Sequence, residues 1–458
     1  MNVPRCCIAL YLSVWLTQPL HAQDPRLDSV PAGDVSSTVL QLGLRDVVDR
    51  ALRNNLATIL GSEAERVADA ERLQDRADLF PKIDALIAGE SRQVSLAAFG
   101  FSGFPGFGPV IGPFGLFDAR ATFSQKLLDF ERRHNLRQST ENHRAAALSN
   151  ANTRELVVLT AVDQYFQVVS SQSRVTATEA QLSRARTLHE RAVDLKSAGL
   201  VPGIDVLRAE VELRTAEQRL IQAKNFVEKE KLGLARAIGL PLAQQFTLSD
   251  SLPADGQSIP SSEDLLAQAF SRRSDSQASE ARIRAAQEDL KSAKGRGLPT
   301  LSLKGDYGVI GPALGDSHGT YSMRVEVRMP VFDRGIDSEA LEKESVLRQR
   351  QAERDSLRGR IELEVRSALL DLNSTTEQLR VARQSQALAV QQLDQAQDRF
   401  SAGVASNLEV VQAQEAVALS DEGVIQSLYG FNIARALLAR ATGSAERSIS
   451  EFFPGSVR

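Results

Sequence analysis

The sequence has 458 residues, of which 54 are basic and 58 acidic, giving a formal net charge of −4. This near-neutral balance argues against a nucleic-acid-binding protein, which normally carries a clear basic excess. Hydrophobic residues make up 42% of the chain, far too few for a protein with many transmembrane helices. A β-barrel membrane protein is not excluded, because its strands alternate apolar and polar residues.

The first segment, residues 1–22, has the features of a secretion signal peptide. Arg5 is followed by an apolar run from Cys6 to Leu16 and then by the small-residue site Leu20-His21-Ala22. The run is too short to span a bilayer of about 30 Å, so a membrane anchor is the weaker interpretation. Both cysteines lie in this segment. The predicted mature chain therefore has no disulfide and no thiolate metal site.

The rest of the chain contains one arrangement twice. Ser197-Ala198-Gly199 recurs as Ser401-Ala402-Gly403 at an offset of 204, whereas Phe80-Pro81 matches Leu298-Pro299 at an offset of 218. The difference fits a longer loop in the first copy, at the uncharged Phe/Gly/Pro-rich stretch 99–117. For this loop, simple packing is a better interpretation than a lid. We predict a first structural repeat at 23–243, a second at 244–443 and a C-terminal tail at 444–458.

Each repeat is predicted to begin with helix and to continue with two strands. The strands fall at about 82–98 and 118–128 in the first repeat, and at about 299–310 and 319–331 in the second. Apolar and polar residues alternate in them, as in Tyr321-Ser322-Met323-Arg324. Their length of about 9–11 residues suits a tilted transmembrane strand. A soluble sheet with one solvated face would show the same alternation, and the first strand is inferred mainly from its repeat mate.

A pair of long helices is predicted to follow, at 130–239 and again at 334–443. These ranges contain almost no proline and are dominated by Ala, Gln, Arg, Glu and Leu. In the second helix of each pair a large apolar residue recurs every seven positions, and mainly small residues stand three positions later. Such a seam favours close, supercoiled packing of helices. The large residues are Val206, Leu213, Leu220, Val227 and Leu234, and Val410, Val417, Val424, Phe431 and Leu438.

Four strands per protomer are too few to close a barrel. In lipid, an open sheet edge leaves backbone groups unsatisfied, at several kcal/mol each, and this cost favours oligomerisation. Barrels need at least about eight strands, and a conducting cavity needs more. The predicted fold class is therefore a mixed α+β membrane protein with an internal two-fold repeat. Three copies would form a twelve-strand transmembrane β-barrel, continued by an α-helical coiled-coil barrel of the long helices.

Polar side chains of the three patterned strands are candidates for lining the barrel lumen. Basic residues outnumber acidic ones among them, which fits either easier passage of anions at the outer mouth or an ordinary polar lining. The candidates are Arg120, Lys126, Lys304, Asp306, Arg324, Glu326 and Arg328.

Three sequence elements resemble the TolC-like outer-membrane efflux protein family. They are the stretch that opens with Leu42-x-Leu44-x-Asp46, the turn Pro330-Val331-Phe332-Asp333, and an Ala-Gly-x-x-x-x-[Asp/Glu]-Val motif at Ala198–Val206 and Ala402–Val410. The resemblance covers essentially the whole mature chain. It implies a homotrimer with its barrel in the outer membrane lipid of a Gram-negative bacterium and a twelve-helix tunnel in the periplasm. It also implies docking to a periplasmic adaptor (membrane fusion) protein and to an inner-membrane transporter.

The repeated motif marks the turns at the ends of the long helices. Gly199 and Gly403 suit the left-handed conformation that ends a helix, and Asp205 and Glu409 follow six residues later. Carboxylates there compensate the helix dipole, which is sufficient to explain them. By resemblance they also form an acidic ring that favours cations and gates passage, Glu409 more than Asp205. At two further family positions, an acid and an arginine, this chain has Gln412 and Ala405, so a latch through that arginine is not expected.

No catalytic residue, metal site or cofactor is predicted. The mature histidines are scattered without zinc-site spacing, and the chain has neither a nucleophile elbow nor a phosphate-binding loop. The predicted function is the outer-membrane channel component of a tripartite efflux system, a passive conduit for small molecules. The alternatives are the outer-membrane duct of type I protein secretion and a non-conducting trimeric coiled-coil protein of the envelope.

Overall fold

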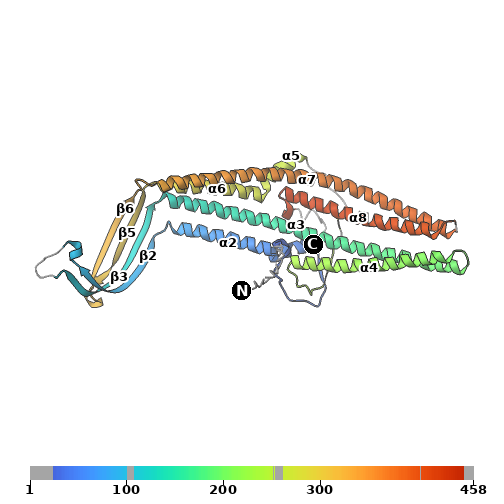
Figure 1. The fold of residues 1–458 in the computed structure, drawn as a ribbon, viewed down its shortest axis with the longest axis horizontal. Helices are drawn as coiled ribbons and strands as arrows, with labels where there is room; N and C mark the ends of the chain where they lie inside the picture. Colours follow the sequence, from blue (N-terminus) through green and yellow to red (C-terminus); the bar gives the residue numbers. More distant parts are fainter. Residues whose placement is uncertain (1–23, 101–107, 251, 253–260, 403, 448–458) are drawn as a thin grey trace, which may run out of the picture. The chain divides into compact units, whose positions relative to one another are not determined.

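The computed structural model describes residues 24–100, 108–250, 252, 261–402 and 404–447. The predicted signal peptide, Gly403 and most of the predicted C-terminal tail lie outside this part of the chain. The chain forms two compact units. Unit 1 comprises Met1–Thr58, Thr160–Leu252 and Ala389–Ile425, and unit 2 comprises Ile59–Leu159, Pro253–Leu388 and Gln426–Arg458. Together they give a mixed fold of long helices and one main sheet (Figure 1).

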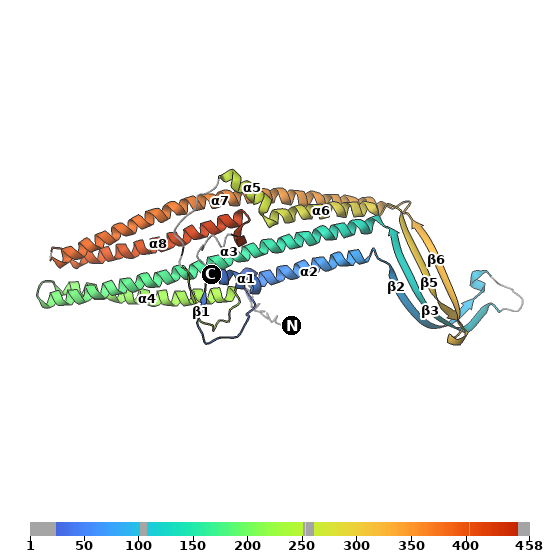
Figure 2. The ribbon, with the colours of Figure 1, turned by 180° about the vertical axis from the view of Figure 1, so that it is seen from behind.

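Unit 2 contains an antiparallel sheet of four strands in the order β2–β3–β5–β6, which lie side by side in both views (Figures 1 and 2). Within the described chain, the edge strands β2 and β6 each pair on one side only. Each therefore presents a row of unpaired backbone N–H and C=O groups. The strands are β2 (Lys82–Ser95), β3 (Val110–Leu128), β5 (Thr300–Gly311) and β6 (His318–Arg328).

The start of β3 differs from the sequence-based prediction of a strand from about 118. β3 begins at Val110 and takes in Pro113, so the predicted loop at 99–117 is shorter than expected. β3 pairs with β5 only from Phe117 onward, and before that residue it pairs with β2 alone. Proline has no backbone N–H to donate. It is tolerated there because one side of β3 has no neighbouring strand to accept such a bond. The centre of the loop, residues 101–107, lies outside the described residues.

The helices of the two halves have equal lengths. None of the helices in the described part of the chain combines the length and the apolar character that a membrane crossing requires. The pairs are α1 (Leu44–Asn54) and α5 (Ser262–Arg272) with 11 residues, α2 (Leu56–Ala77) and α6 (Ser274–Gly295) with 22, α3 (Phe130–Ser197) and α7 (Arg334–Ser401) with 68, and α4 (Gly203–Ala237) and α8 (Asn407–Ala441) with 35.

The heptad seam forms the helical core of unit 1. There the C-terminal part of α3 and the start of α4 pack against the end of α7 and the start of α8. Val410 and Val417 are buried, and the small residues Ala209 and Ala413 are fully buried between the helices. A side chain no larger than a methyl group lets the helix axes approach closely. The predicted burial of this stripe is confirmed at these positions.

A short parallel pair of strands, β1 (Leu40–Leu42) and β4 (Phe246–Leu248), also belongs to unit 1. Next to it, the Asp250 carboxylate accepts hydrogen bonds from the Leu44 backbone N–H at 2.9 Å and from the Tyr165 hydroxyl at 3.0 Å. Tyr165 is fully buried, and burial together with the neighbouring Asp250 raises the pKa of its hydroxyl. The start of α1, the end of β4 and α3 are thus joined at one carboxylate.

Replacing Tyr165 by Phe should destabilise unit 1 by about 1–2 kcal/mol, because Asp250 loses a donor inside the protein. Thermal unfolding of the purified protein in detergent would measure the effect. The control is Tyr321→Phe, since Tyr321 is 81% exposed. Equal melting temperatures for the two variants would contradict the expectation.

Unit 2 contains a buried cluster of charged side chains between helices. Arg273 is 2% exposed and binds Asp275 at 2.7 Å and Glu364 at 2.5 Å. Arg440 of α8 lies 3.6 Å from Glu155 of α3, and both side chains are buried. Burial raises the pKa of Glu155, and the nearby Asp275 adds to this while Arg440 opposes it.

This cluster predicts a pH dependence of stability. The folded state holds the Glu155 proton more tightly than the unfolded chain, so this residue's contribution falls as pH rises above the ordinary glutamate pKa of about 4.3. Melting temperatures of wild type and Glu155→Gln should therefore move apart between pH 4 and pH 7, with the variant losing less stability. Parallel curves would contradict a raised pKa.

Candidate functional site

The seven predicted lumen residues lie on one face of the sheet. Directly opposed residues of neighbouring strands point to the same side, as do residues two apart on one strand. The register places Lys126, Ser302 and Glu326 in one row and Ser124, Lys304 and Arg324 in the next. Rows through Asp306 and Arg328 continue the face, and Arg120 follows it along β3. This polar face of the sheet collects side chains from all four strands.

Ion pairs join most charged residues of the polar face. Exposed pairs contribute little to stability, but they fix where the side chains lie. Of the predicted residues, Arg324 stands outside these pairs. The pairs are Arg120–Asp118 at 2.6 Å, Arg120–Asp306 at 3.3 Å, Lys304–Glu326 at 3.0 Å, Arg328–Glu326 at 2.9 Å and Lys126–Asp129 at 2.6 Å.

Three acids of the polar face were not predicted from the sequence: Asp84 and Glu90 of β2, and Asp118 of β3. Asp118 immediately precedes the part of β3 in which the sequence analysis recognised alternation. Its negative charge lowers the excess of basic over acidic residues on the face. Asp84 of β2 lies in the row of Thr122 and Asp306. In the sequence, the polar residues Lys82 and Asp84 alternate with the apolar residues Ile83 and Ala85, which could have indicated this face. Leu86 then interrupts the alternation.

Arg324 and Asp84 differ from the other charges of the polar face. Arg324 is exposed on β6 with Lys304 directly opposite, and no described acidic side chain pairs with it. Asp84 is exposed on β2, and no described basic side chain pairs with it. They lie on the two edge strands, Asp84 on β2 and Arg324 on β6.

The opposite face of the sheet is apolar and exposed. A continuous apolar patch exposed on a protein surface indicates contact with another apolar phase, such as lipid or a partner. Its alternation with the polar face is the pattern of a barrel wall. The most exposed members are Ile83 (71%), Ile87 (77%), Tyr307 (74%), Tyr321 (81%), Met323 (77%), Val325 (65%) and Val327 (68%).

The predicted turns between long helices lie in unit 1. Gly199 has φ of +74°, which only glycine adopts without strain, and α4 begins four residues later at Gly203. Asp205 and Glu409 are in the first turns of α4 and α8. Gly403, the other predicted turn glycine, lies outside the described residues.

The two turn acids differ in their surroundings. The Asp205 side chain is 8% exposed and accepts a hydrogen bond from Arg208 at 3.2 Å. The backbone oxygen of Asp205 accepts another hydrogen bond from the side-chain amide of Asn407, and the Asn407 residue is fully buried. The Glu409 side chain is 43% exposed and lies 3.3 Å from Arg399. The Glu409 carboxylate is therefore partly exposed beside Arg399, whereas the backbone oxygen of Asp205 joins the two turns of unit 1.

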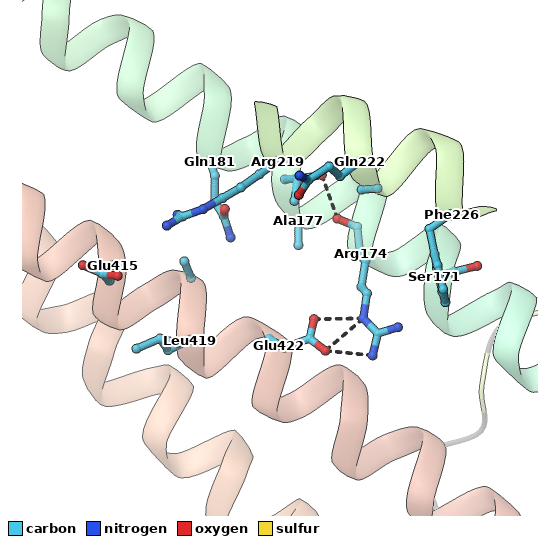
Figure 3. A pocket seen from close by; sticks show the side chains of 13 residues that line it. Ser171, Arg174, Ala177, Gln181, Arg219, Gln222, Phe226, Glu415, Leu419 and Glu422 are labelled. Carbon is cyan, nitrogen blue, oxygen red and sulfur yellow. Dashed lines mark hydrogen bonds and ion pairs between the residues drawn. The ribbon is translucent and has the colours of Figure 1, made fainter. Parts of the chain in front are cut away.

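A cavity of about 560 Å³ lies farther along unit 1, between α3, α4 and α8. Small side chains such as Ala177 and Ala223 are among those that line it. At one end Arg174 binds the Glu422 carboxylate, with nitrogen–oxygen distances of 2.7 to 2.9 Å (Figure 3). Close to the cavity, burial and the neighbouring Glu415 raise the pKa of Glu212, which Arg219 partly offsets.

Replacing Asn407 by Ala should destabilise the turns of unit 1 by about 1–2 kcal/mol, since the buried Asp205 oxygen would lose its donor. Limited proteolysis of the folded protein, followed by mapping of the cut sites, would show faster cleavage near residue 200. Gln412→Ala, at an exposed position of the same helix, is the matched control. Unchanged cleavage in Asn407→Ala would refute a structural role for this bond.

Comparison with known proteins gives one consistent family. The sequence profile of the outer membrane efflux protein family matches residues 47–240 and 265–444. The probable efflux pump outer membrane protein TtgC of Pseudomonas putida is 23% identical over 428 residues, covering 88% of this chain and 84% of TtgC. The pyoverdine export outer membrane protein OpmQ of Pseudomonas aeruginosa is 25% identical over 414 residues, covering 84% of this chain and 81% of OpmQ. These names describe efflux and export, not catalysis.

Solved structures show the same fold. The CmeC outer membrane channel of Campylobacter jejuni superposes with a TM-score of 0.76 at 17% identity, covering 99% of this chain and 97% of CmeC. The outer membrane protein VceC of Vibrio cholerae gives a TM-score of 0.74 at 17% identity, covering 87% of this chain and 96% of VceC. The similarity extends over both the helices and the sheet.

Proposed function

The chain belongs to the outer membrane efflux protein family, and from that premise we propose that it is the passive channel of a tripartite efflux system. As a family member it is an outer-membrane protein of a Gram-negative bacterium, with its helices in the periplasm. Small molecules would pass through it from the periplasm to the exterior. The energy would come from a partner in the inner membrane, because a conduit without catalytic residues has no energy source of its own.

One observation carries the proposal: among the described residues, the sheet has a polar face, an exposed apolar face and two unpaired edges. In lipid such a sheet is stable only if its edges are paired. Three copies would pair every edge in a twelve-strand barrel, with the apolar side chains toward lipid and the charged rows toward the lumen. A diameter that leaves an aqueous path requires more strands than the smallest barrels have.

The lengths and number of the helices support the proposal of a tunnel that continues the barrel. Their equal lengths in the two halves fit the proposed two-fold repeat at 23–243 and 244–443. With α3, α4, α7 and α8 from each of three copies, the ring would contain twelve helices. TtgC is named for an efflux pump and OpmQ for pyoverdine export. We propose a periplasmic adaptor protein and an inner-membrane transporter as partners, on the same family grounds.

The turns of unit 1 are the proposed periplasmic end of the tunnel. Glu409 would contribute the exposed carboxylate of an acidic ring, because its side chain is 43% exposed. Asp205 would contribute less, because it is buried and bonded within its own chain. Gly199, with its positive φ, would allow the sharp reversal between α3 and α4.

Single-channel recording in planar bilayers tests the proposal. The purified trimer should conduct, and Glu409→Gln should weaken block by divalent cations and raise conductance. Asp205→Asn is the matched control and should change conductance less, since Asp205 is 8% exposed. A folded trimer that never conducts, even with both acids replaced, would exclude the conduit and leave a structural protein of the envelope.

A further inference from the structure

The cavity of unit 1 between α3, α4 and α8 has a closed ion pair at one end only. There Arg174 binds Glu422 with nitrogen–oxygen distances of 2.7 to 2.9 Å, at the end where Phe226 lies (Figure 3). At the other end are Arg219 and Glu415, and among the described residues no ion pair joins these two. We call this second end the open end of the cavity, because its charges are not used up by each other.

The open end has more acidic than basic groups. A guanidinium nitrogen of Arg219 lies 4.0 Å from a carboxylate oxygen of Glu212, which is two turns earlier on α4. Burial raises the pKa of the Glu212 carboxyl, and the neighbouring Glu415 adds to this, so the two carboxylates are close enough to repel each other. No basic side chain in the described part of the chain pairs with Glu415. One guanidinium therefore serves two carboxylates, and a further positive charge placed there would be stabilised.

Apolar side chains line the cavity between its two ends. Ala177 of α3 and Ala223 of α4 contribute small groups, and Leu419 of α8 lines the cavity while 69% exposed. A large exposed leucine beside small side chains leaves an apolar surface that a ligand can cover. Binding sites for small molecules are typically hollows of about 300–1,000 Å³ with mainly apolar walls and a few placed polar groups. The cavity, with its volume of about 560 Å³, has the size and the composition of such a site.

Two other kinds of ligand suit the open end less well. A bare metal ion would lie beside the Arg219 guanidinium, and nowhere do the described residues bring together three side chains of the types that hold a metal. An anion would be attracted by one guanidinium and repelled by two carboxylates. A monovalent cation with a bulky apolar body needs only one available carboxylate, and its body can cover the apolar wall.

We propose that this cavity is a binding site for a monovalent organic cation with an apolar body. The charged group of the ligand would lie at Glu415, close to Glu212. The apolar body would cover Ala177, Ala223 and Leu419. All of these residues belong to unit 1 of one chain, and the site requires neither a closed barrel nor conduction. The proposal therefore goes beyond the proposed channel function and does not depend on it.

Calorimetric titration of the purified protein in detergent with tetraphenylphosphonium tests the site, with protein-free micelles as the blank. The wild type should bind one equivalent per chain. Glu415→Gln should weaken binding about threefold to fivefold, the effect of removing one exposed charge pair. Arg219→Gln should strengthen binding, because the competing base is gone. Glu217→Gln is the matched control and should leave the affinity unchanged, since Glu217 of α4 pairs with Arg214 and does not line the cavity.

The ion tetraphenylborate separates charge from shape, because it has nearly the same shape as tetraphenylphosphonium and the opposite charge. It should bind the wild type about tenfold more weakly. Equal affinities for the two ions would mean a cavity without charge preference and would overturn the cation site. An affinity for tetraphenylphosphonium that is the same in Glu415→Gln and wild type would overturn it as well, and so would a wild type without saturable binding.

A second variant keeps the test decisive if Glu415→Gln fails to fold. Leu419→Ala changes a residue that is 69% exposed, so the fold should tolerate it, and it should weaken binding of tetraphenylphosphonium about threefold through lost apolar contact. Unchanged binding in this variant would contradict the proposed position of the apolar body. A protein that conducts without binding the cation would refute the site alone, and one that binds it without conducting would refute the channel alone.

Discussion

Unpaired backbone groups at the edges of a sheet are the constraint on which the rest of this structure depends. In the part of the chain that the structure describes, β2 and β6 each present such an edge, beside an apolar face that is largely exposed. Water would satisfy the edges but not the apolar face, and lipid would satisfy the face but not the edges. Pairing with further copies would satisfy both, and for this reason we propose that the chain is one part of a closed wall.

The long helices depend on a different interaction, which is close packing along their seams. Long helices with a weakly apolar surface are stabilised by tight seams, and Ala209 and Ala413 supply the close approach in unit 1. The turns then receive specific bonds, such as that from Asn407 to Asp205. The Asp205 side chain is buried beside Arg208, whereas the Glu409 side chain is exposed beside Arg399.

Two positions that correspond in the proposed repeat make one similar bond but differ in charge. In unit 1 the amide of Asn55 donates to the carbonyl of Ala237 at 3.3 Å. At the corresponding place in unit 2, Arg273 donates to the carbonyl of Ala441 at 3.4 Å. Asn55 is neutral, whereas the buried guanidinium of Arg273 needs Asp275 and Glu364 as counter-charges. The second half therefore carries an ionic cluster.

The sequence by itself determined the long helices, the alternating strands and the heptad stripe, because period and turn chemistry are properties of neighbouring residues. It also identified the polar lumen candidates as a set. Only the tertiary structure decided that β3 lies next to β5, that Asp205 is buried while Glu409 is exposed, and that Tyr165 meets Asp250. These features depend on residues far apart in the chain, and no local pattern records which distant group will arrive to pair with a strand edge or a carboxylate.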